Sequence, residues 1–284
     1  MKKIVAILMA GLSAISAHAQ LTPEGIMALL PDMPSQTVMI GVATHNTEFN
    51  DRSEDTQAWE EYFVKLQEVI GQAEEAVTRE QENAAGELSI EAVKARAEAV
   101  AGAMVEKVKN MSAEELIAFA KSKAKAGASA KSSGINTVVK YQEIMAKGAE
   151  MSQKPQKILD EARQAIYDLW NNGYKINYDA ASKNEQAAFA KYGEDPDKVT
   201  EYTAAKLQVY KVVSEFQEKS YVLWRNAVLE AMTFLKTDYL LYTRQLAEDM
   251  KQMGNLAAGQ DMEVALMYLR QALALRDMPN PIHE

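Results

Sequence analysis

The longest helix that the sequence predicts, about 196–253, restricts the chain to helical architectures. Between Pro196 and Gly254 there is neither glycine nor proline, the two residue types that most often end a helix. An unbroken helix there would hold about 57 residues and would be roughly 85 Å long. Asp195 supplies a cap, and Pro196 sits at a first-turn position. Such a helix must be covered by other helices along its apolar sides.

The same segment is apolar on more than one side. A coiled-coil frame fits its first half, although Lys206 and Ser220 fall at inward positions of that frame. We expect a break at 236–238, where Lys, Thr and Asp follow one another. A helix that is apolar around much of its circumference needs neighbours on several sides. Either other helices supply them all, or the remainder is an interface with a partner or a second copy, for which the candidate residues are Trp224, Tyr239 and Tyr242.

Composition agrees with a helical fold. Hydrophobic residues make up 48% of the 284 positions, which is typical of a folded globular chain, and there are only 13 glycines and 7 prolines. The predicted fold class is all-α, an elongated multi-helix bundle with long coiled-coil-like helices.

The N-terminal half contains one clear amphipathic helix and one ambiguous segment. Apolar residues from Trp59 to Val77 recur every three or four positions, which predicts a helix from Ser53 to about Ala85. A short helix is expected to start at Thr22, with Pro23 at its first position. We expect 36–50 to be extended or irregular, packed on helices, because its short strand-like run has no β partner.

Further helices are expected along the rest of the chain. Two of them begin at Ser89 and at Ser112, and others span 138–151, 158–170, about 180–192 and about 261–278. We expect the helix over 138–151 to end before Pro155, and the next one to close at Asn171-Asn172-Gly173.

The predicted organisation has five parts. A signal peptide (1–19) precedes a short helix and an irregular segment (20–52). A first helical half (53–126) is joined to a second helical half (135–284) by a flexible linker rich in Gly, Ala, Ser and Lys (127–134).

The first nineteen residues have the pattern of a cleaved secretion signal. Lys2 and Lys3 precede a mainly apolar run, and Ala17-His18-Ala19 places small residues at the cleavage positions. Cleavage after Ala19 predicts a periplasmic or secreted chain. The apolar run is shorter than the roughly 20 residues of a transmembrane helix, so we expect no span.

Charge and composition argue against several function classes. Removal of 1–19 changes the formal net charge from −9 to −11, which disfavours nucleic-acid binding. There is no cysteine, and the three histidines have no ligand or triad spacing. We therefore expect no catalytic residue, metal or cofactor. Carboxylate-only catalysis, as in glycosidases, is the remaining enzymatic alternative.

A basic stretch stands out in this acidic chain. No Asp or Glu lies between Glu115 and Glu143, and five lysines do. They either keep a solvated linker soluble or contact an anionic envelope surface such as lipid head groups. The lysines are Lys121, Lys123, Lys125, Lys131 and Lys140.

A second candidate site combines aromatic rings with amides. Such residues either cap a helix and fill the core, or stack on and hydrogen-bond a sugar or peptide. They are Tyr167, Trp170, Asn171, Asn172, Tyr174, Asn177 and Tyr178.

Taken together, these features predict a non-catalytic helical binding or scaffolding protein of a bacterial cell envelope or its exterior. It would act through protein–protein contacts, with another envelope protein or with itself. The alternative is a carrier or receptor for a small hydrophobic or sugar ligand, bound between helices near Trp170 and Tyr174.

Overall fold

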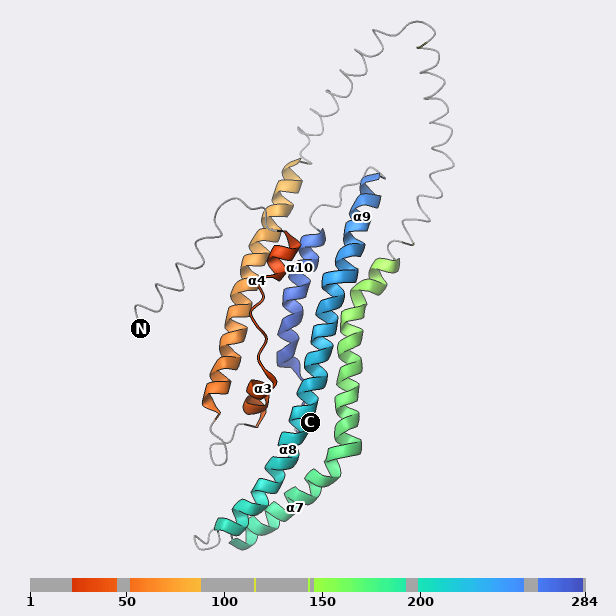
Figure 1. The fold of residues 1–284 in the computed structure, drawn as a ribbon. Helices are drawn as coiled ribbons and strands as arrows, with labels where there is room; N and C mark the ends of the chain where they lie inside the picture. The colour runs from red at the N-terminus through yellow and green to blue at the C-terminus, as the bar shows by residue number, and fades with distance from the viewer. Residues whose placement is uncertain are drawn as a thin grey trace, which may run out of the picture.

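The computed structural model describes residues 22–44, 52–87, 115, 143, 146–192, 199–252 and 260–282. Within these ranges all regular secondary structure is helical, which confirms the all-α class. Long helices lie side by side in an elongated bundle (Figure 1). The elements are α2 (Pro23–Met27), α3 (Gln36–Ala43), α4 (Ser53–Glu87), a helical segment over 146–169, η2 (Trp170–Tyr174), α7 (Lys175–Tyr192), α8 (Val199–Phe234), η4 (Leu235–Tyr239), α9 (Leu240–Gln252), α10 (Gln260–Gln271) and η5 (Ala272–Asp277).

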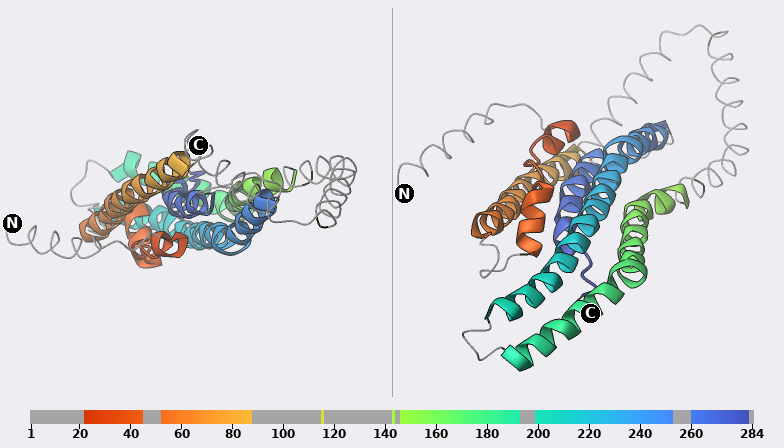
Figure 2. Two further views of the ribbon diagram at one scale, coloured as in Figure 1. Left: turned by 90° about the horizontal axis from the view of Figure 1, so that it is seen from above. Right: turned by 60° about the horizontal axis from the view of Figure 1, so that its bottom comes forward.

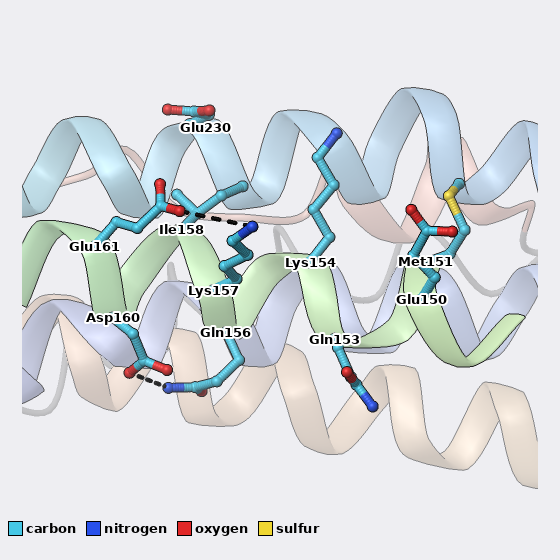
Figure 3. Close-up of a pocket in the computed structure, with 10 residues that line it drawn as sticks. All are labelled: Glu150, Met151, Gln153, Lys154, Gln156, Lys157, Ile158, Asp160, Glu161 and Glu230. Atoms are coloured by element: carbon cyan, nitrogen blue, oxygen red, sulfur yellow. Dashed lines mark hydrogen bonds and ion pairs between the residues drawn. The ribbon is translucent and has the colours of Figure 1, made fainter. Parts of the chain in front are cut away.

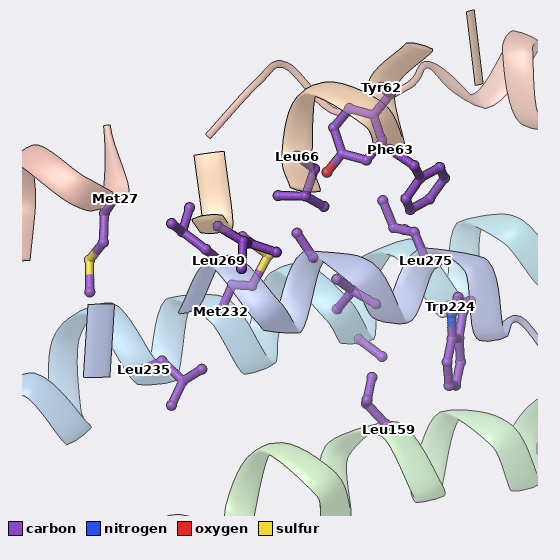
Figure 4. Packing of buried hydrophobic residues seen from close by; sticks show 14 of the residues in the cluster. Met27, Tyr62, Phe63, Leu66, Leu159, Trp224, Met232, Leu235, Leu269 and Leu275 are labelled. Carbon is purple, nitrogen blue, oxygen red and sulfur yellow. The ribbon is translucent and has the colours of Figure 1, made fainter. Parts of the chain in front are cut away.

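The amphipathic helix predicted from Ser53 is confirmed as α4. Its apolar stripe is buried, and Phe63 and Leu66 are fully inaccessible to solvent. These side chains pack on others from α8, α10 and η5 (Figure 4). The three- and four-residue spacing turns one face of the helix toward the core, so burial of that face holds α4 in place.

Helix α10 lies between α4 and the long helix that α8 begins (Figures 1 and 2). Val264, Ala265, Leu266 and Leu269 are buried in this layer. The predicted start of the last helix near Asp261 and its end before Pro279 are confirmed.

Polar contacts run along the edge between α4 and the C-terminal helices. Arg270 binds Glu74 at 2.6 Å, and Arg276 binds Glu60 at 2.9 Å. Because the partners lie 196 and 216 residues apart in the chain, these pairs fix the register between its two ends.

The predicted long helix is present as α8, η4 and α9, one continuous helix over 199–252. The expected break at 236–238 is wrong. That position holds η4, a π-helical turn, which accommodates an extra residue without interrupting the helix. The turn places the rings of Phe234 and Tyr239 almost parallel, with their centroids 6.3 Å apart. The Tyr242 ring is almost parallel to that of Tyr239 at 6.2 Å, and we call these three rings the aromatic ladder.

The expectation of an extended or irregular segment over 36–50 is wrong where the structure describes it. Residues Gln36–Ala43 form helix α3. The Ser35 hydroxyl accepts a hydrogen bond from the Val38 amide at 3.2 Å, so a cap starts the helix. An apolar run without a β partner satisfies its backbone as a helix instead. As expected, the segment packs on other helices, here α4 and α8.

The expected helix end before Pro155 is also wrong. The segment 146–169 is helical throughout, with Pro155 buried inside it. It bends near its N-terminal end (Figure 1), as helices do where a proline removes one backbone hydrogen bond. Burial of the proline ring against neighbouring helices offsets that loss.

The expected closure at Asn171-Asn172-Gly173 is wrong for a related reason. These residues lie in η2, a second π-helical turn, through which the helix continues into α7. Trp170 and Tyr174, at the two ends of the turn, are both buried against Phe216 of α8. Tertiary packing of these two rings keeps the chain helical where the local sequence favours a stop.

Several expectations lie outside the described residues. They are the signal peptide 1–19, almost all of the helices expected from Ser89 and Ser112, and the linker 127–134. Where it is described, the chain on both sides of that linker contributes to one hydrophobic core.

Helices α7 and α8 extend beyond this core as a two-helix arm, comprising residues 175–192 and 199–211 (Figures 1 and 2). Between Tyr178 and Val212 the structure describes one buried apolar residue, Ala181, and no described residue of that stretch belongs to the main hydrophobic cluster or packs against it. Within the arm, α7 packs along α8, and Phe189 meets Tyr202 with ring centroids 5.4 Å apart.

Candidate functional site

The aromatic and amide cluster predicted around Trp170 separates into two parts. Trp170 and Tyr174 are buried, and their rings lie 5.0 and 5.7 Å from that of Phe216. Tyr178 is half-buried beside Trp170, and Tyr167 is half-buried on the preceding turn. The amides of Asn171, Asn172 and Asn177 face solvent. The rings of Trp170, Tyr174 and Tyr178 therefore already contact other aromatic rings, and the three Asn residues are exposed.

The three candidate interface residues also separate. Trp224 is only 1% exposed, and its indole N–H donates a hydrogen bond of 2.7 Å to the Ala274 carbonyl. It is a core residue, so its place as an interface anchor is wrong. Tyr239 and Tyr242 are half-buried, and burial raises the pKa of both phenols.

Two lysines of the segment 146–169 lie over the aromatic ladder of the long helix. The Nζ of Lys154 is 4.4 Å from the centre of the Phe234 ring, and the Nζ of Lys147 is 5.6 Å from that of Tyr242. Such geometry is a cation–π contact. Gly148 allows the segment 146–169 to lie close to Tyr242 of α9, because a Cβ at this position would be 3.2 Å from the Tyr242 hydroxyl oxygen.

A groove lies beside this ladder, between the start of 146–169, η4 with α9, and α10. Its volume is about 530 Å³, within the range of small-molecule sites. Val264 and Thr243 are buried in it, and its other lining residues include Ser152, Leu246, Glu263 and Met267. No sequence motif indicates this groove, because three elements that are far apart in the sequence form it.

A second, larger hollow of about 810 Å³ follows the outside of the segment 146–169. Figure 3 shows its side chains pointing to opposite sides of one helix: Lys154 and Ile158 to one side, Gln153 and Gln156 to the other. Its polar groups pair locally, as Gln156 does with Asp160. It is an open surface rather than an enclosure.

A buried polar cluster joins α4, α8 and α10. The Tyr221 hydroxyl donates to the Pro34 carbonyl at 2.8 Å, whereas the Tyr62 hydroxyl has no hydrogen-bond partner among the described residues. Burial, and then the nearby Tyr221 and Tyr268, raise the pKa of Tyr62 well above its usual range. Phenols with a raised pKa stay neutral at physiological pH.

The arm carries apolar side chains that the described residues leave uncovered. Ile176, at the base of α7, is 81% exposed, Phe189 is 56% exposed, and Leu207 on α8 is 36% exposed. The candidate anionic-contact residues Lys121, Lys123, Lys125 and Lys131 lie outside the described residues.

The described residues show neither a membrane-spanning helix nor a metal-binding cluster. They contain no helix that is both long enough and apolar enough to cross a bilayer. They also contain no group of three or more His, Asp or Glu side chains arranged to hold a metal ion. Comparisons with protein-family models, with curated proteins and with solved structures return no match.

Proposed function

We propose that this protein is an exported, non-catalytic helical scaffold of a bacterial cell envelope or its exterior, and that it binds a partner protein through the two-helix arm. The observation that supports this most is the projection of the arm beyond the core. Two helices packed only on each other bury little apolar surface, whereas a partner that adds a third or fourth helix would cover the rest.

The exposed residues of the arm are of the right kind for such contacts. Phe189 lies near the C-terminal end of α7, and Ile176 lies near its N-terminal end. Aromatic and large aliphatic anchors carry much of the energy of protein interfaces. The export part of the proposal is supported by the composition of residues 1–19 alone.

The experiment compares two double variants of the mature chain, each immobilised and exposed to envelope extract. In the arm variant, Ile176→Ser is combined with Phe189→Ser. In the matched control, Val64→Ser is combined with Leu241→Ser, two comparably exposed positions outside the arm. We expect both variants to melt like the parent chain, because surface substitutions cost little stability.

The arm variant should lose the proteins that the parent chain retains, and the control should keep them. Equal retention by all three chains would contradict the proposal. So would equal losses by both variants.

A further inference from the structure

The groove beside the aromatic ladder has the composition of a small-molecule site and lies outside the arm. Its walls are half-buried: the Tyr239 and Tyr242 rings, Leu246, and the thioethers of Met250 and Met267. Methionine side chains are flexible and polarisable, so they adapt to apolar ligands of different shapes. This lining fits the apolar body of a ligand.

The two aliphatic hydroxyl donors of the groove are already engaged. The Ser152 hydroxyl donates to the Ala149 carbonyl at 2.9 Å, and the Thr243 hydroxyl donates to the Leu240 carbonyl at 2.9 Å. Both bonds fall within one helical turn, so these side chains offer a ligand little beyond weak acceptor capacity.

Glu263 is the charged group of the groove. Its Oε1 accepts a hydrogen bond of 2.7 Å from the Gln81 amide, which orients the carboxylate. Among the described residues no lysine or arginine forms an ion pair with it, and Arg244 of α9 binds Glu24 and Asp261 instead. A half-buried carboxylate without a cation favours a positively charged ligand group.

The rings favour the same sign of charge. Aromatic ring faces attract cations, and the Lys147 ammonium already lies above Tyr242, 5.6 Å from its ring centre. The net charge of the whole chain, −9, would also raise the local concentration of a cation.

We infer that this groove binds a small amphipathic cation, an amine with an apolar body. The ammonium group pairs with Glu263, and the apolar body lies along Tyr239, Met250 and Met267. This ligand site is separate from the arm, so the inference does not depend on the proposed partner.

The test uses three probes with the same apolar body: octylamine, 1-octanol and octanoate. Each is titrated at neutral pH into the full chain carrying ¹³C-methyl methionine. The signals of Met250 and Met267 are assigned with Met250→Leu and Met267→Leu. We expect octylamine to shift both signals and to bind about tenfold more tightly than octanol, because only the amine forms a charge-assisted contact. Octanoate should bind most weakly.

Two variants locate the determinants. Glu263→Gln should reduce octylamine binding to the level of octanol without changing octanol itself, whereas Glu230→Gln, on the outer hollow, should change neither. Ala149→Trp places a bulky ring at an exposed wall position and should abolish binding of every probe. Octanoate binding as tightly as octylamine would overturn the inference. An unchanged octylamine affinity in Glu263→Gln would also overturn it. So would signal shifts of equal size at methionines outside the groove.

Discussion

The indole N–H of Trp224 donates a hydrogen bond of 2.7 Å to the backbone carbonyl of Ala274, fifty residues further along the chain. The contact ties the middle of α8 to η5, and the same indole is only 1% exposed. One side chain therefore combines a large buried surface with a polar anchor between two elements.

We expect Trp224→Ala to lower the free energy of unfolding by roughly 3–5 kcal/mol, because it removes a large core side chain and leaves a cavity. Trp224→Phe keeps most of the apolar volume but leaves the Ala274 carbonyl unpaired, at a cost of about 1–3 kcal/mol. Leu223→Ala, at the partly exposed neighbouring position, should cost less than either. Denaturant unfolding measures all three. Unchanged stability in Trp224→Ala would mean that α8 presents a different face to the core.

The Tyr62 hydroxyl predicts an unusual response to substitution. It is buried without a hydrogen-bond partner among the described residues, so Tyr62→Phe removes a desolvated polar group and keeps the ring. We expect the variant to be as stable as the parent chain at pH 7, or more stable by about 1 kcal/mol. Tyr221→Phe is the matched control, because it breaks the 2.8 Å bond to Pro34 and should destabilise. A large loss in Tyr62→Phe alone would show that this hydroxyl has a partner.

The tyrosines also set the alkaline limit of stability. Burial raises the pKa of Tyr62, Tyr221 and Tyr268 in the folded chain above the ordinary value of 10.0. Near and above that pH the unfolded chain releases phenolic protons that the folded chain retains, so unfolding becomes easier as pH rises. We expect the denaturant midpoint to be insensitive to these groups below pH 10 and to fall above it. The fall should be shallower in Tyr62→Phe, and an identical fall would refute this assignment.

Two arginines on the C-terminal helices should differ in how much they contribute to the free energy of unfolding. The Arg270–Glu74 pair is about half exposed on both sides, so Arg270→Gln should cost at most about 0.5 kcal/mol, an effect that salt screens. Arg276 binds Glu60 and also lies 4.2 Å from the centre of the Phe63 ring. We expect Arg276→Gln to cost about 0.5–1 kcal/mol more, most of it persisting in high salt. Equal costs of the Arg270→Gln and Arg276→Gln substitutions at both salt concentrations would argue against the cation–π contribution.

Export makes a prediction of its own. Cell fractionation followed by N-terminal sequencing should find a mature chain that begins at Gln20 outside the cytoplasm, because Ala17 and Ala19 supply the small residues that signal peptidase requires. A cytosolic chain that still begins at Met1 would contradict it.

The sequence predicted best the elements whose signal is regular and long. The stripe from Trp59 to Val77 predicted α4, and the absence of Gly and Pro predicted a long helix over about 196–253, although not its continuity through 236–238. Periodicity of this kind reflects burial of one face, which the fold then satisfies.

The errors fall where packing between distant segments overrides a local signal. Pro155 and Gly173 favour helix ends, yet both lie inside continuous helices. At the second position the burial of Trp170 and Tyr174 against Phe216 explains the outcome. The groove around Glu263 could not be predicted from the sequence either, because its walls come from three elements that are far apart in the sequence.

Site-specific photo-crosslinking in intact cells tests the central claim, that the arm is the binding surface. A photoreactive residue at Phe189 in the arm is compared with one at Val64 on α4, since these positions are almost equally exposed, at 56% and 53%. We expect the Phe189 position to yield a discrete crosslinked species, either with another envelope protein or with a second copy of the chain, and the Val64 position to yield none. The same species from both positions, or a crosslink from Val64 alone, would contradict the account.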